Sequence, residues 1–179
     1  DAGGALPRKS VLGAISHLEQ ADRRALHRLR VRLGPLDVYL GQLLKPAAQL
    51  WRAALLAVRS GLPMPSLPPA GAATLGAEAD PRGAVLAYRR AGRDWLRIDL
   101  ADRLASHAHK VRSAGGDNPV DIELATSIGL DEEAVARFMA DVGFTRAGDR
   151  WRWRGRRPPR PDRRTAPSYA FAELAKLKT

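Results

Sequence analysis

Residues 119–155 constrain the fold more than any other stretch, because they order two helices and two strands within a short length. Ala125, Gly129 and Val135 stand at the offsets that a helix-turn-helix requires. The small Ala125 lets the helices cross closely, and Gly129 can take the positive φ of the turn. Val135 is expected to plug the second helix into the first. The spacing therefore predicts a helix-turn-helix, an arrangement that also occurs in proteins that never bind DNA.

Both of these helices carry end signals. Asn118-Pro119 is expected to begin the first helix as its cap and first-turn proline. The carboxylates at 131–133 favour the start of the second helix, and Gly143 is expected to end it. The next residues, FTRAGDRWRWRG (144–155), are typical of a hairpin, or wing. We therefore predict a mainly α chain with short β-hairpins: a helical bundle plus a winged-helix-like unit, that is, a helix-turn-helix plus wing.

A short motif occurs twice in the chain. Arg-Ala-Gly, two charged residues of opposite sign and then Trp run from Arg90 to Trp95 and again, 56 positions later, from Arg146 to Trp151. In each copy a glycine supplies a turn and the tryptophan starts the returning strand. Because Trp95 is followed by apolar residues, it is expected to pack in the core. The repeat is interpreted mainly as one fold device used twice.

The second copy has gained positive charge. Trp151 and Trp153 are two apart and share one face of a strand, which leaves the alternate arginines 150, 152 and 154 on the other. A covered aromatic face would leave a row of guanidinium groups in solvent, whereas an open one could stack on bases. We favour the covered arrangement, since half-buried hairpins are common. In both arrangements the wing can bind backbone phosphates.

The charge of the chain points to nucleic acid. The net charge is +11, and residues 145–164 alone hold nine Arg against two Asp. Such a balance favours anionic partners. Residues 156–164 cannot pack a core, and we expect them to be disordered when free, serving as a nucleic-acid tail or, more blandly, as a solubilising linker. The candidate nucleic-acid-binding residues are Arg146, Arg150, Trp151, Arg152, Trp153, Arg154, Arg156, Arg157 and Arg160.

The rest of the chain divides at its proline-rich stretch. Residues 1–61 are expected to be a helical accessory region, with 5–33 helical, Asp22 as a cap, and an extended stretch at 36–40. A further helix is expected to begin at Pro46, to end at Gly61 and to carry an apolar stripe formed by Leu50, Trp51, Ala54, Leu55 and Val58. Residues 62–83 contain five prolines and are predicted to be a linker or a surface loop.

The C-terminal part is predicted in two units. Residues 84–155 are expected to form a hairpin, a helix capped by Asp99, and the winged-helix-like unit. Residues 156–179 are expected to be a basic tail with a short C-terminal helix. That helix would place Phe171, Leu174 and Leu177 on one face, which could dock on the body or bind a partner.

Several classes of function find no support in the sequence. There is no cysteine, which excludes disulfides and thiolate sites and fits a reducing, cytoplasmic location. The four histidines lack metal-ligand spacing, and no phosphate-binding, nucleophile-elbow or zinc-protease motif occurs. No apolar run is long enough to cross a membrane. We predict no catalytic site here and no membrane partner.

Four segments resemble one protein family. They are LRVRLGPLDVYLGQLLKPAAQLWRAALLAVRSGL (29–62), AYRRAGRDWLRIDLADRLASHA (87–108), IGLDEE (128–133) and YAFAELAKLK (169–178). Together they are similar to the C-terminal region of bacterial relatives of the mitochondrial degradosome RNA helicase, which are superfamily two, DExH-type enzymes. Leu33 and Gly41 depart from the Phe and Pro that such relatives tend to have.

The resemblance implies a largely helical accessory body beside the RNA path of an ATP-dependent RNA helicase. The motor domains, with their ATP and Mg, would lie upstream and outside this chain, which we expect to be a piece of a longer protein. The resemblance also implies RNA as partner and, in some members, an exoribonuclease.

These residues lead to three hypotheses about the function. The first is a non-catalytic helicase accessory region that binds RNA backbone without sequence specificity, with DNA as a second candidate ligand. The second is an interaction module that recruits a ribonuclease or another protein through the face of Phe171, Leu174 and Leu177 and through the acidic helix that begins at 131–133. The third is a DNA-binding winged-helix regulator, which Asp131, Glu132 and Glu133 argue against because they would meet phosphates at the start of the recognition helix.

Overall fold

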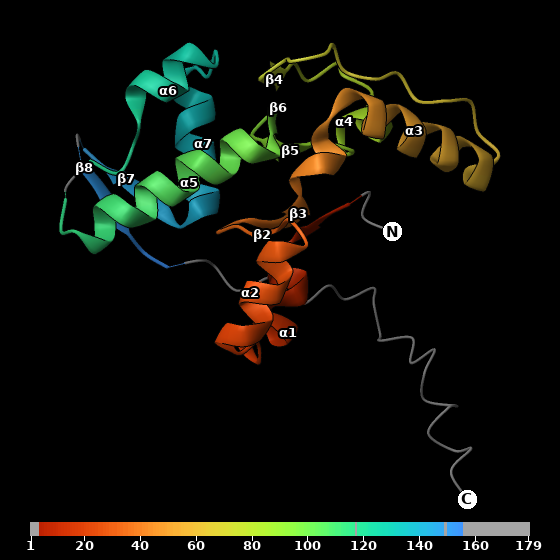
Figure 1. The fold of residues 1–179 in the computed structure, drawn as a ribbon. Coiled ribbons are helices and arrows are strands. Elements are labelled where there is room, and N and C mark those ends of the chain that lie inside the picture. Colours follow the sequence, from red (N-terminus) through yellow and green to blue (C-terminus); the bar gives the residue numbers. More distant parts are fainter. Residues whose placement is uncertain (1–3, 117, 149, 156–179) are drawn as a thin grey trace, which may run out of the picture.

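The structure is a computed structural model, and it describes residues 4–116, 118–148 and 150–155. Helices alternate in it with small antiparallel sheets (Figure 1). Among the described residues the sheets have the strand orders β1-β3-β2, β4-β6-β5 and β7-β8. The predicted combination of helices with short hairpins is confirmed. None of the described helices is long and apolar enough to cross a membrane.

The N-terminal part is less helical than the sequence predicts. Strand β3 (Asp37–Leu40) pairs with β1 (Ala5–Pro7) on one side and with β2 (Val31–Leu33) on the other. The helix expected over 5–33 is therefore wrong at both ends, although the extended stretch expected at 36–40 is confirmed. Leucine spacing suggested a helix, but pairing with the distant strand β3 decides the conformation of these short segments.

Short helices lie between β1 and β2. They are the 3-10 turn η1 (Arg8–Val11), α1 (Leu12–Ser16) and α2 (Gln20–Arg28). Glu19 caps α2, and its backbone N–H donates to Asp22 Oδ2 at 3.0 Å. Asp22 is thus the third residue of the helix and completes a capping box with Glu19. The expectation that Asp22 itself caps the helix is wrong. Arg30, at φ 62°, takes the left-handed conformation between α2 and β2.

Helix α3 (Pro46–Ser60) follows the 3-10 turn η2 (Gly41–Leu44). It begins at Pro46 and ends at Gly61, which has φ 66°, as predicted. Its inward face is formed by Gln49, Arg52 and Ala53, and Arg52 Nη1 donates to the carbonyls of Leu43 at 2.8 Å and Leu86 at 2.9 Å. The apolar stripe of α3 instead faces solvent: the exposed large side chains are those of Leu50, Trp51, Leu55 and Val58.

Residues 62–83 run back past α3 towards the β4-β6-β5 sheet (Figure 1). They contribute β4 (Thr74–Leu75), which pairs with β6, and the start of α4 (Pro81–Ala84). Asp80 caps α4 by accepting from the Arg82 backbone N–H and also accepts from the Ser66 N–H, both at 2.9 Å. This proline-rich stretch is therefore packed on the body along much of its length.

The first predicted hairpin consists of β5 (Tyr88–Ala91) and β6 (Asp94–Arg97), and α5 (Ile98–Ser113) follows directly. The expected cap of α5 is wrong. Arg97 precedes the helix, and Asp99 lies within its first turn, where it binds the Arg97 side chain. Helix α5 is central to the core, because it buries Leu100, Leu104 and Ala108 along one side.

The next helices are α6 (Ile122–Ser127) and α7 (Glu132–Val142). Helix α6 begins later than predicted: Asp121, and not Asn118, caps it by accepting from the Leu124 N–H at 3.0 Å. The turn between the helices is as predicted. Ala125 is buried, and Gly129 has φ 76°. Val135 packs against the core.

Hairpin β7 (Phe144–Ala147) and β8 (Arg150–Trp153) completes the described chain. Gly143, at φ 110°, ends α7 as expected and passes the chain into β7. The order of α6, turn, α7 and hairpin therefore agrees with the predicted helix-turn-helix plus wing. The assignment to the winged-helix fold itself stays a prediction.

The N-terminal segment and the hairpin-helix segments share contacts. Leu36 belongs to the same buried cluster as Leu100 and Phe138. Asp37 and Arg89 form an ion pair of 2.6 Å in which the side chains are only 11% and 21% exposed. These contacts connect β3 and the residue before it with the β5–β6 hairpin and α5, which lie on the other side of the proline-rich stretch in the sequence.

Candidate nucleic-acid interface and a neighbouring cleft

The two RAG motifs have the same backbone arrangement. Arg90 pairs with Trp95 and Arg146 pairs with Trp151, each one step beyond a tight turn. The turn glycines, Gly92 at φ 68° and Gly148 at φ 64°, both have the left-handed conformation that favours glycine. The two motifs thus form the same kind of hairpin turn with the same strand register, which confirms the structural interpretation of the repeat.

The first copy is a core element. Trp95 is 6% exposed, and the Arg90 guanidinium lies 4.0 Å from the centre of its ring system. Leu96, next to it, is fully buried. The packing role expected for Trp95 is confirmed.

The second copy places its aromatic face against the core. Trp151 and Trp153 are half-buried and pack against the buried cluster. The ring centroid of Trp153 lies 5.0 Å from that of Phe144 and 5.1 Å from that of His109, both in edge-on contacts. The Arg112 guanidinium covers Trp153 from 4.7 Å. This is the covered arrangement that we favoured, and the contact of the two indoles with nucleic acid stays a prediction.

The opposite face of β8 is cationic. Arg150, Arg152 and Arg154 are exposed, and none has an ion pair or side-chain hydrogen bond within residues 4–116, 118–148 and 150–155. Strand geometry accounts for this, because alternate side chains point to opposite faces and the indoles occupy the inner one. Three guanidinium groups therefore project from the outer face of the hairpin, and none of their N–H donors has a partner among the described residues.

Arg146 differs from these three. It forms an ion pair with Glu132, and its Nε donates to the Gly148 carbonyl at 3.2 Å. Its charge is thus largely compensated within the protein, so Arg146 fixes the hairpin to the start of α7.

The carboxylates at the start of α7 are all used internally. Asp131 caps the helix by accepting from the Ala134 N–H at 2.6 Å. Glu132 pairs with Arg146, and Glu133 pairs with Arg137. The start of α7 therefore presents two carboxylates paired with arginines and one that caps the helix, where a base-reading helix needs donors and acceptors directed at the groove.

Some predicted site residues lie outside the described chain. These are Arg156, Arg157 and Arg160 of the basic tail, and Phe171, Leu174 and Leu177 of the C-terminal segment.

A second candidate site was not predicted from the sequence. A cleft of about 660 Å³ lies where β3, η2, the start of α3, the proline-rich stretch and the start of α5 meet. Its charged and polar lining residues are Arg32, Tyr39, Lys45, Gln49, Tyr88, Arg97, Asp99, Asp102 and Arg103. They are scattered over 72 positions with no motif spacing, and only tertiary structure brings them together.

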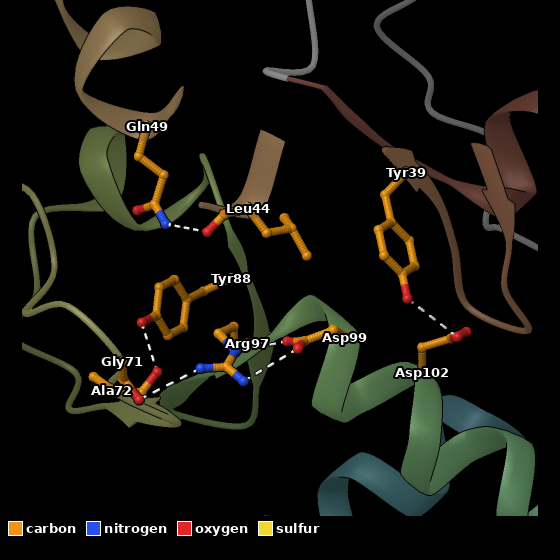
Figure 2. Close-up of polar contacts among 9 residues, drawn as sticks. All are labelled: Tyr39, Leu44, Gln49, Gly71, Ala72, Tyr88, Arg97, Asp99 and Asp102. Atoms are coloured by element: carbon orange, nitrogen blue, oxygen red, sulfur yellow. Dashed lines mark hydrogen bonds and ion pairs between the residues drawn. The ribbon is translucent and has the colours of Figure 1, made fainter. Parts of the chain in front are cut away.

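Hydrogen bonds hold one wall of the cleft in place (Figure 2). Arg97 makes a two-pronged contact with Asp99, at 2.7 Å and 3.1 Å, and also donates to the Gly71 carbonyl at 3.4 Å. The Tyr88 hydroxyl donates to the Ala72 carbonyl at 2.7 Å. These contacts connect the proline-rich stretch to β5 and β6, and they hold the Arg97 guanidinium in one position.

Across the cleft, the Tyr39 hydroxyl donates to Asp102 Oδ2 at 3.2 Å (Figure 2). Burial raises the pKa of Asp102 above its usual range, although the hydrogen bond from Tyr39 opposes this. Burial and the neighbouring carboxylate raise the pKa of Tyr39 as well. Asp102 Oδ1 is buried without a hydrogen-bond partner and lies against Gly34, where a Cβ would collide with it.

Within the described ranges, no group of three His, Asp or Glu side chains is placed to hold a metal ion. Comparison with models of protein families, with curated proteins and with solved structures finds no match to this chain.

Proposed function

We propose that this chain is a non-catalytic accessory region of an ATP-dependent RNA helicase and binds RNA backbone without sequence specificity. The outer face of β8 is the proposed contact surface. The basic tail, with Arg156, Arg157 and Arg160, would extend this surface beyond the described residues.

The observation that carries the proposal is the alternation along β8. Its indoles are used in packing, whereas Arg150, Arg152 and Arg154 are exposed and have no acidic partner in the described part of the chain. Guanidinium groups with free donors form charge-assisted hydrogen bonds with phosphate oxygens. A row of them on a strand can follow a nucleic-acid backbone.

The same geometry favours binding without base recognition. The half-buried indoles are engaged in packing, and two of the carboxylates at the start of α7 are paired with arginines. Contacts to phosphate carry no sequence information directly. The DNA-binding regulator, the weakest of the three hypotheses, is therefore disfavoured again.

The helicase assignment rests on the sequence resemblance. In that setting the ATP and Mg would belong to motor domains outside this chain, and this region would hold the strand that enters or leaves the motor.

The test is the salt dependence of binding to single-stranded RNA. The variant Arg150→Ala/Arg152→Ala/Arg154→Ala should flatten the slope of log affinity against log salt by about 0.7 for each lost contact, or about 2 in total. A fourfold rise in salt would then weaken the wild type roughly twentyfold more than the variant.

A matched control removes the same charge elsewhere. Arg24, Arg28 and Arg30 are exposed residues in and just after α2. Their replacement by Ala should leave the slope close to wild type. A slope that is unchanged in the β8 variant, or lowered equally in the control, would refute the assignment to β8.

The competing hypothesis of a ribonuclease-recruiting module relies on Phe171, Leu174 and Leu177, which lie outside the described residues. It stays a prediction. Its check is a pull-down of the candidate exoribonuclease with the chain truncated after residue 165, which abolishes capture only if the segment carries the contact.

A further inference from the structure

We propose that the cleft beside α3 is a binding site for a nucleoside 5′-monophosphate group. The choice of a nucleotide rests on the proposed function, whereas the anion preference rests on the cleft itself. Its volume of about 660 Å³ is within the range of small-molecule sites.

The charges of the cleft favour an anion. Arg32, Lys45 and Arg103 line it from three different segments, and none of them makes a hydrogen bond or ion pair within the described ranges. Arg97 also lines it but is paired with Asp99. Asp102, whose Oδ2 accepts from Tyr39, interacts electrostatically with Arg32. With Arg97 paired to Asp99 and Arg32 near Asp102, the excess charge of the lining is positive and lies on Lys45 and Arg103.

One polar side chain of the lining offers an acceptor. Gln49 Nε2 donates to the Leu44 carbonyl at 2.7 Å (Figure 2). Gln49 Oε1 has no hydrogen bond among the described residues and is not sealed from solvent, so it can accept from a donor such as a ribose hydroxyl or a base amine.

Part of the lining is apolar. Leu44, Leu67, Pro68 and Pro69 also border the cleft. A ligand that carries a sugar and a flat ring beside its phosphate can use both kinds of lining, whereas inorganic phosphate would leave the apolar residues unused.

The test uses the described chain with uridine 5′-monophosphate and uridine as probes in isothermal titration. Uridine 5′-monophosphate should bind at least about tenfold more tightly than uridine, as one charge-assisted hydrogen bond implies. Lys45→Ala/Arg103→Ala should remove this difference. Both side chains are exposed, and so is the control pair Arg24→Ala/Arg28→Ala, which should preserve it. Equal binding of the two probes, or an unchanged difference in the cleft variant, would overturn the proposal.

A second arm identifies the source of the phosphate. If the cleft holds the end of a strand, a 5′-phosphorylated oligouridine should bind more tightly than its 5′-hydroxyl form, and the cleft variant should equalise them. If the cleft holds a free nucleotide, only the mononucleotide probe should respond. The Arg150, Arg152 and Arg154 variant should weaken both oligonucleotides alike and leave mononucleotide binding unchanged, so either proposal can fail without the other.

Discussion

Removal of the Asp37 carboxylate tests whether the N-terminal segment and the first hairpin form one folded body. Asp37 lies in β3 and Arg89 in β5, and their ion pair of 2.6 Å is mostly shielded from solvent. In Asp37→Ala the Arg89 guanidinium loses this partner, and its Nε already has none. Breaking a buried pair costs about 3–5 kcal/mol, and the partial exposure of both side chains favours the lower limit, about 3 kcal/mol. The melting temperature should fall by about 6–12 °C.

A double-mutant cycle separates the pair from other effects of the substitution. Because Arg89→Met removes the stranded charge, the double variant should be more stable than the sum of the single losses predicts, by about 2 kcal/mol. Urea unfolding followed by circular dichroism provides the free energies. Glu133→Ala is the control, since its exposed pair with Arg137 should contribute less than about 0.5 kcal/mol. Additive losses in the Asp37–Arg89 cycle would refute the idea that this pair joins the two segments.

Three further predictions follow from single sites. Gly143→Ala should lower the free energy of unfolding by about 1–3 kcal/mol, because the new Cβ would be 2.8 Å from the Trp153 ring at φ 110°; thermal melts showing no loss would contradict this packing. Tyr88→Phe should cost about 1 kcal/mol in urea unfolding by removing the bond to the Ala72 carbonyl, and an unaltered midpoint would count against it. Burial raises the pKa of Asp102, so its ionisation destabilises the folded state as pH rises above the unfolded-chain value of about 3.9. Asp102→Asn should therefore be more stable than wild type at pH 7 and lose this advantage near pH 3, and an equal difference at both pH values would argue against the buried anion.

The parts of the fold that were predicted correctly depend on local signals. Glycines at 92, 129 and 143 are required where the backbone takes positive φ, and their positions fixed the turns of the first hairpin and of the helix pair. Alternation of Trp and Arg along β8 fixed which face is covered, because side chains of a strand alternate strictly.

The errors arise where distant residues decide the structure. Ala5–Pro7 and Val31–Leu33 become strands only because both pair with β3, and their own spacing does not show this. The cap of α6 was placed at Asn118 because proline follows it, whereas Asp121 accepts the bond from the third helical residue. Both kinds of error come from local rules that a competing contact overrides.

The cleft shows the same limit for function. Its cations come from β2, the residue before α3, and α5, so no motif joins Arg32, Lys45 and Arg103 in the sequence. The lack of a side chain at Gly34 makes room for Asp102, which no local pattern of the sequence indicates. By contrast, the exposed arginines 150, 152 and 154 were predicted, since two of them lie in β8 and the third directly follows it.

The most direct test of the central claim is fluorescence-anisotropy binding of this chain to short labelled single-stranded RNA, duplex RNA and duplex DNA across a salt series. We expect RNA binding that weakens steeply with salt and varies little between sequences. The absence of binding to all three ligands at low salt would contradict it, and the arginines of β8 would then have no role in holding nucleic acid.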